Sequence, residues 1–167
     1  TELPDVWEVG ADFQNVCEAA LFGAPIHFHR DGIPETATIL TDDAKNAAFD
    51  VDVERPEETP FMQAAQRLTA GMAELAANAT FLGRPIRVRP YVPSGSDGPL
   101  TVAMNLRGPA ILIDFRRDPD YVHRLFDRIV TAAIRRHQRL PQMHGQPRPA
   151  EVWLADDSIA MLSTAQY

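Results

Sequence analysis

Four short strand-like segments, either apolar or alternating apolar and polar and separated by helical stretches, constrain the fold of this chain more than any other feature. The segments lie at residues 6–9, 25–29, 86–90 and 152–155. Strand-length apolar segments that alternate with helices are typical of α/β domains, in which parallel strands are the default. The sequence therefore predicts an α/β fold, and its 167 residues are enough for one domain with a hydrophobic core.

Two longer helices have clear start signals. From Pro60 to Asn78, apolar residues recur at helical spacing, and the proline suits a first turn. Asp118 is a natural N-cap before Pro119, and the helix that begins there is expected to end before Pro141. The face of this second helix that is expected to lie in solvent carries Arg124, Arg128, Arg135 and Arg139.

Three further segments carry weaker signals. Residues 15–22 are expected to form a short helix, and residues 44–49 a helix capped by the acidic residues before them. Residues 93–99 are rich in glycine, serine and proline, so they are expected to form a loop.

Composition narrows the classes of partner and compartment. The net charge of −7 argues against a nucleic-acid binder, which needs a clustered positive field. No apolar run approaches the roughly 18 residues of a membrane span, and no secretory signal is recognised at the N-terminus. Cys17 is the only cysteine, which suits a reducing cytoplasm, and a core position is expected for it. A cytoplasmic protein without nucleic-acid or membrane partners is therefore expected.

The stretch from Glu151 to Ser163 is the strongest candidate site in the sequence. A short apolar strand is followed at once by Asp156, Asp157 and Ser158. Polar groups at the carboxyl end of a strand are where α/β folds place their chemistry, and an aspartate there can act as an acid, a base or a cation-holding group. The alternative is that one of the two aspartates only caps the turn that follows.

Two other sets of residues are candidates for binding or catalysis. Arg87 and Arg89 share one face of a strand and form a plausible receptor for carboxylates, unless they pair with acids of this chain. Asp12 follows a strand-like run, although a single aspartate before a helix is more often a cap.

A metal site within the chain is not expected. His27 and His29 point the same way on a strand and could share one metal ion. The other ligands that such a site needs are missing from suitable positions, since the only lysine, Lys45, lies in a predicted helix. The nucleotide-binding glycine signatures and Cys-x-x-Cys are also absent from the sequence.

Four segments resemble the uroporphyrinogen decarboxylase superfamily, and they follow one another in the family's order. They are residues 22–25 (Phe-Gly-Ala-Pro), 98–108, 118–123 and 155–163. The resemblance implies a TIM-type (β/α)₈ barrel with its site at the carboxyl ends of the strands. Full-length members are about twice as long as this chain, so the resemblance implies a single domain that is truncated at both ends and holds roughly the N-terminal half of the barrel.

The resemblance also implies a function, with alternatives. The first is a lyase that acts on a carboxylate-rich tetrapyrrole. The alternative is a zinc-dependent corrinoid or thiol methyltransferase of the same superfamily, and the third is an inactive fragment or binding module. Met104 stands where the decarboxylase has a tyrosine, and Asp157 where it has a serine. Asp12 is the nearest match to the aspartate that stabilises a protonated pyrrole in the decarboxylase.

On this basis the expected catalytic residues are Asp12, Asp156 and Asp157. The expected substrate-binding residues are Arg87, Arg89, Arg107 and Ser158. The substrate is a small molecule, either a tetrapyrrole or a methyl donor, and a homodimer is possible. No cofactor is expected within the chain. In the methyltransferase alternative, the resemblance implies zinc ligands beyond Tyr167 and a corrinoid partner.

Overall fold

Helices and short strands alternate along the chain in the computed structural model, which describes residues 3–13, 16–92 and 95–163. The α-helices are α1 (Cys17–Leu21), α2 (Pro60–Ala76), α3 (Pro99–Arg107), α4 (Ala110–Arg117) and α5 (Pro119–Met143). The strands are β1 (Trp7–Val9), β2 (Ile26–His27), β3 (Glu35–Thr36), β4 (Thr80–Phe81), β5 (Arg84–Val88), β6 (Gly95–Asp97) and β7 (Trp153–Ala155). Among the described residues, short 3₁₀ turns include η2 (Asp42–Ala44), η3 (Ala47–Phe49), η4 (Pro56–Glu58) and η5 (Asp157–Met161). The predicted mixed α/β class is confirmed.

The strands of the described residues pair in three small sheets. β1 and β5 are parallel, with Trp7 opposite Ile86, and β4 adds to β5 in the antiparallel sense. β6 and β7 form a second parallel pair, and β2 and β3 an antiparallel hairpin. The expected parallel pairing therefore holds for two of the four pairs. Helices lie between the partners of both parallel pairs, as a parallel connection requires.

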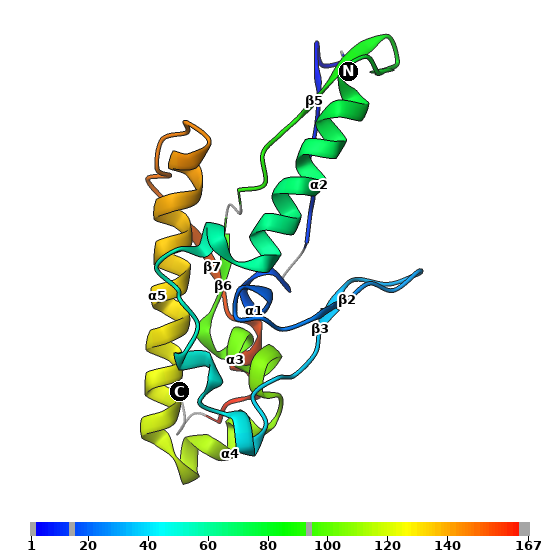
Figure 1. Cartoon of the computed structure of the whole chain (residues 1–167). Coiled ribbons are helices and arrows are strands. Elements are labelled where there is room, and N and C mark those ends of the chain that lie inside the picture. Colours follow the sequence, from blue (N-terminus) through cyan, green and yellow to red (C-terminus); the bar gives the residue numbers. More distant parts are fainter. Residues whose placement is uncertain (1–2, 14–15, 93–94, 164–167) are drawn as a thin grey trace.

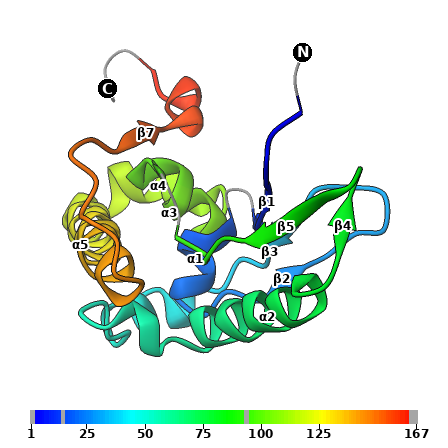
Figure 2. The same ribbon diagram turned by 90° about the horizontal axis from the view of Figure 1, so that it is seen from above.

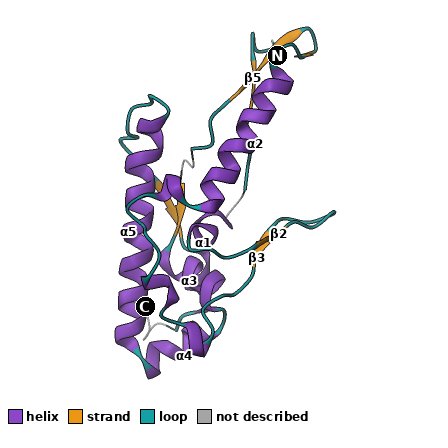
Figure 3. Cartoon of the chain, in the orientation of Figure 1, coloured by secondary structure: helices purple, strands orange, loops and turns teal. Residues whose placement is uncertain are grey.

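The elements form a helical body, which contains α1, α3, α4 and α5, and an arm, which contains α2, β1 and β5 (Figure 1, Figure 3). α5 runs along one side of the body, next to α3 and α4, and α2 extends away from it beside β1 and β5. Viewed from above, α5 and α2 lie on different sides of α1 (Figure 2). The β2–β3 hairpin projects from the body. The arm therefore projects beyond the helical body and is not enclosed by it.

The main hydrophobic core lies between α3 and α5. Val102 and Leu106 of α3 are fully buried there, as are Leu125 and, almost fully, Ile129 of α5. The buried α5 residues recur every three or four positions, which places them on one face of the helix. This packing fixes α5 next to the segments that carry β6 and β7.

The start of α5 is confirmed and its end is not where the sequence predicted. Asp118 Oδ1 accepts a hydrogen bond from the Tyr121 N–H at 3.2 Å, as expected of an N-cap. The helix continues through Pro141 to Met143 instead of ending before the proline. Leu140 and Pro141 are both buried, so packing compensates for the single helical hydrogen bond that the proline nitrogen cannot donate.

Three other sequence predictions need correction. Residues 95–97, expected in a loop, form β6, while residues 93–94 of that predicted loop lie outside the described residues. Residues 44–49 form parts of two 3₁₀ turns and not a continuous helix, and α4 was not anticipated. β6 lacks the apolar alternation of an ordinary strand because its glycine accommodates the Trp153 ring.

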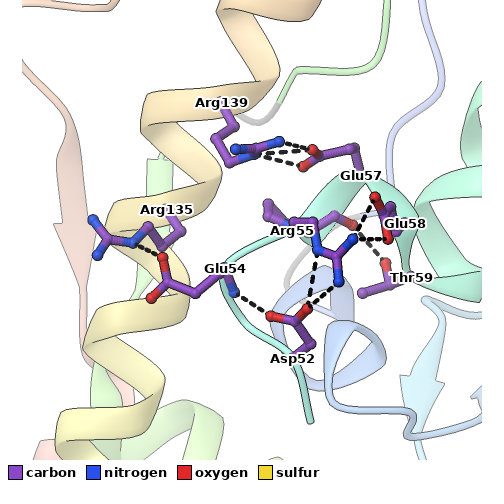
Figure 4. A network of polar contacts seen from close by, with 9 residues as sticks. Asp52, Glu54, Arg55, Glu57, Glu58, Thr59, Arg135 and Arg139 are labelled. Carbon is purple, nitrogen blue, oxygen red and sulfur yellow. Dashed lines mark hydrogen bonds and ion pairs between the residues drawn. The ribbon is translucent and has the colours of Figure 1, made fainter.

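The arginine side chains on the outer face of α5 bind other residues of the chain and do not simply point into solvent (Figure 4). Arg135 Nε lies 2.5 Å from Glu54 Oε2, and Arg139 forms a two-pronged pair with Glu57. Arg128 donates to the carbonyl oxygens of Phe49, at 3.2 Å, and of Val51. Arg124 lies over the Phe49 ring. The expectation of a free face was wrong because residues 49–57 fold back along the helix.

In the described part of the chain, every helix is either too short or too polar to cross a membrane.

Candidate functional site

A cavity of about 960 Å³ is the candidate site. Residues 10–12, which follow β1, and residues 89–92, which follow β5, line one part of it. β6 and β7 contribute Gly95, Ser96, Asp97, Trp153 and Ala155. In α/β folds, ligands bind beyond the carboxyl ends of parallel strands, and both parallel pairs of this chain contribute to the lining. A smaller cavity of about 410 Å³ lies between the end of α1 and residues 51–60.

The lining of the larger cavity is acidic. Arg89 is the one arginine or lysine among its described lining residues. Five carboxylate residues contribute to the same lining: Asp12, Glu18, Asp97, Glu151 and Asp157. The cavity therefore favours a neutral or cationic ligand over one with many negative charges.

A buried ion pair lies behind the cavity wall. Arg136 of α5, with 1% of its surface exposed, donates from Nη1 to Glu18 Oε1 of α1 at 2.6 Å. Its Nη2 donates to the Gly95 carbonyl oxygen at 2.9 Å. Glu18 also accepts hydrogen bonds from the Ser96 hydroxyl and the Asp97 backbone N–H, both at 3.3 Å. The pair thus joins α1, α5 and β6.

The ionic state of this pair follows from its surroundings. Burial alone would raise the pKa of Glu18, but the charge of Arg136 and the hydrogen bonds to the carboxylate outweigh it and lower that pKa. Burial raises the pKa of Cys17 to about 12, so its thiol, which donates to Glu18 Oε2 at 2.7 Å, is neutral. The predicted core position of Cys17 is confirmed, and a neutral thiol is a poor nucleophile.

Two other titratable groups beside the pair are shifted. Burial, followed by the negative charge of Glu18, raises the pKa of Asp97 to about 6. Burial and the charge of Arg136 lower the pKa of His137 to about 4, so its imidazole is neutral at pH 7. Asp97 Oδ2 is buried and has no hydrogen-bond partner among the described residues. A half-buried carboxyl group that titrates near neutrality is suited to proton exchange.

The structure separates the roles of Asp156 and Asp157. The Asp156 carboxylate accepts hydrogen bonds from the backbone N–H of Leu100, at 3.2 Å, and from the N–H and hydroxyl of Thr101, at 2.9 and 2.8 Å. It therefore caps α3, a helix distant in sequence, and is not among the cavity-lining residues. Asp157 does line the cavity. The Ser158 backbone N–H donates to Thr101 Oγ1 at 3.1 Å.

The other predicted site residues are distributed over the molecule. Asp12 and Arg89 line the cavity. Arg87 lies 3.5 Å from Glu8 on the exposed face of the small sheet. Arg107 is buried beneath α4, where it bonds the Asp114 and Asp42 carboxylates and the Leu40 carbonyl oxygen. The structure thus brings together Asp12, Arg89 and Asp157, and the substrate and catalytic roles of all seven residues stay predictions.

The described residues do not fit a metal centre. His29 Nε2 lies 3.1 Å from Glu35 Oε1, and both side chains are largely exposed. Within residues 3–13, 16–92 and 95–163, no group of three or more histidine, cysteine, aspartate or glutamate side chains could hold a metal ion. The zinc of the methyltransferase alternative therefore has no site among the described residues.

Three residues in or directly behind the cavity wall were not anticipated from the sequence. Arg136 extends the buried stripe of Leu125, Ile129 and Ala132 by one further turn of α5, which was a usable signal. Glu18 and Asp97 had no comparable signal, because the partners that define them lie 118 and 79 positions away.

Comparison of the chain with protein-family models, with curated proteins and with solved structures found no match.

We expect Asp156→Ala to lower the free energy of unfolding by about 0.5–2 kcal/mol, the usual effect of losing a helix cap. The carboxylate that satisfies the first N–H groups of α3 is lost in this variant. Urea unfolding measures the change. Asp157→Ala is the matched control, and its stability should stay within about 0.5 kcal/mol of wild type. Equal stability of both variants would contradict the capping role.

Proposed function

We propose that this chain forms part of a (β/α)₈ barrel enzyme of the uroporphyrinogen decarboxylase type and that its small-molecule substrate binds in the acidic cavity. The four sequence segments that resemble the superfamily support the barrel. Two parallel strand pairs with helices between the partners, β1–β5 and β6–β7, are consistent with it, because such units build barrels.

The charge of the cavity favours the methyl-transfer branch of this superfamily, and this is the observation that carries the proposal. A tetrapyrrole with several carboxylates needs a set of arginines to hold it. Arg89 is the only arginine or lysine of the described lining, against five carboxylates, and Arg136 neutralises one of these, Glu18. Arg87 and Arg107, the other arginines expected to hold substrate, pair with acids of the chain itself.

In such an enzyme, the chain's own residues bind and orient the reacting molecules. Asp157 and Asp97 present carboxyl groups to the cavity, and Arg89 can orient one anionic group. Zinc, held by ligands that the resemblance implies beyond Tyr167, would supply activation of the accepting thiol.

Tetrapyrrole decarboxylation is the second candidate, and one residue favours it. Asp12 lines the cavity after β1, as expected of the aspartate that stabilises a protonated pyrrole in the decarboxylase. A carboxylate at that position stabilises a developing cation by electrostatics.

Two anaerobic assays on the full-length protein, with the zinc ligands that the resemblance implies beyond Tyr167, decide between these reactions. In one, methylcobalamin and homocysteine are supplied with zinc chloride, and loss of the methylcobalamin absorbance is followed. In the other, uroporphyrinogen is supplied, and products with fewer carboxylates are separated by chromatography. We expect methyl transfer above the protein-free rate and no decarboxylation. The methyl-transfer rate should fall about tenfold or more in Asp157→Asn, because a positioned polar group is removed.

The opposite pattern, decarboxylation that is lost in Asp12→Asn, would overturn the choice of methyl transfer. Asp120→Asn is the matched control for both assays, since Asp120 is an exposed residue in the first turn of α5, away from the cavity. Absence of both activities would contradict an enzymatic function for this chain.

A further inference from the structure

β6 is held by the buried ion pair at each of its three residues. Arg136 donates to the Gly95 carbonyl oxygen, and Glu18 accepts from the Ser96 hydroxyl and from the Asp97 N–H. Both partners of the pair are almost fully buried. Because each side chain of the pair is fixed by the other, the backbone that carries Asp97 has little freedom to move.

Asp97 lies at the carboxyl end of β6, opposite Ala155 of β7, and lines the acidic cavity. One of its carboxyl oxygens has no hydrogen-bond partner in the described part of the chain. The charged and titratable groups that act on it come from every element packed around it. They are Glu18 of α1, Arg136 of α5, and Asp156 and Asp157 after β7.

We propose that Asp97 is the proton-exchanging residue of the cavity and that the buried Glu18–Arg136 pair is its positioning support. The proposal takes from the proposed function only that the cavity is the substrate site. The carboxylic acid gives its proton to a basic atom of the bound molecule, and the carboxylate takes one back from that molecule or from water.

The surroundings of Asp97 suit this role. Burial disfavours the charged form of Asp97 most, and the nearby negative charges of Glu18, Asp157 and Asp156 add to this, while Arg136 offsets them only in part. The neutral acid therefore persists to higher pH than for an exposed aspartate, whose pKa is about 3.9. An aspartate bonded to the pair only through its backbone keeps its carboxyl group available to a ligand.

The test is a carboxyl-carbon NMR titration of the protein without any substrate. Wild type should show one aspartate that titrates near pH 6, and this signal should be missing in Asp97→Asn and present in the control Asp120→Asn. Asp157→Asn, which removes one facing negative charge, should lower the midpoint by about half a pH unit. A midpoint near the ordinary aspartate value in wild type would overturn the proton-exchanging role.

The positioning role is tested by Arg136→Lys in the same titration. Lysine keeps the positive charge but lacks the planar guanidinium that donates to the Glu18 carboxylate and the Gly95 carbonyl oxygen from two different nitrogens. We expect the Asp97 midpoint to move by about half a pH unit or more, because the carboxyl group shifts relative to Glu18. If Arg136→Lys lowers stability but leaves the midpoint unchanged, the pair is merely structural. The titration uses no substrate, so a negative result would overturn only the role of Asp97. The methyl-transfer and decarboxylation assays test the proposed function independently.

Discussion

Replacing Arg136 with methionine lowers the free energy of unfolding by about 3–5 kcal/mol, the range observed when one partner of a buried ion pair is removed. The variant leaves the Glu18 carboxylate, only 6% exposed, without its cationic partner. It also leaves the Gly95 carbonyl oxygen without the Arg136 donor. Urea unfolding monitored by circular dichroism measures the change.

Arg135→Met is the matched control on the preceding residue of α5. Arg135 pairs with Glu54 on the surface, where ion pairs contribute about 1 kcal/mol or less. The double variant Glu18→Gln with Arg136→Met should regain part of the lost stability, because no unpaired charge then remains inside. Equal effects of Arg136→Met and Arg135→Met would contradict a buried pair.

Gly98→Ala produces the second large effect, a loss of about 2–4 kcal/mol from overpacking and from disruption of a helix cap. A Cβ atom at Gly98 would overlap the Asp156 side chain, which accepts the first hydrogen bonds of α3. β7 and the turn after it would then have to move away from α3. Urea unfolding again measures the loss.

Gly71→Ala is the control for an added methyl group. Gly71 lies inside α2 and has no atom within 4 Å of the added Cβ position. Alanine has the higher helix propensity, so this variant should gain about 0.5–1 kcal/mol. A Gly98→Ala protein as stable as wild type would show that the Asp156 carboxylate does not lie against this glycine.

Local signals explain which parts of the fold could be predicted. The starts of α2 and α5 follow from apolar spacing, Pro60 and the Asp118 cap, all of which act within a few residues, whereas α2 ends at Ala76 and not at the predicted Asn78. The end of α5 could not be predicted, because Pro141 stays helical through burial against distant residues, and no local pattern records that burial. β6 was missed for the same reason, since a strand of small and polar residues forms only when β7 pairs with it.

The candidate site also contains some residues that local sequence signals predicted and others that they did not. Asp12 and Asp157 were predicted because each follows a strand, and Arg89 because it shares one strand face with Arg87; all three line the cavity. Asp156 was expected either to act in catalysis or to cap its own following turn, and its carboxylate instead caps α3 from 55 positions away. The burial of Arg136 follows the apolar stripe of α5, but its partner Glu18 and the position of Asp97 follow only from the three-dimensional structure, where α1, α5 and β6 meet.

We expect a methyl donor to bind in the acidic cavity, and hydrogen–deuterium exchange with and without methylcobalamin tests this most directly. Slower exchange should appear in residues 10–12, 89–92, 95–97 and 153–157, which border the cavity, and the effect should weaken in Asp157→Asn. Residues 51–60, beside the smaller cavity, should be unaffected. Protection confined to residues 51–60, or none in the cavity segments, would contradict the account.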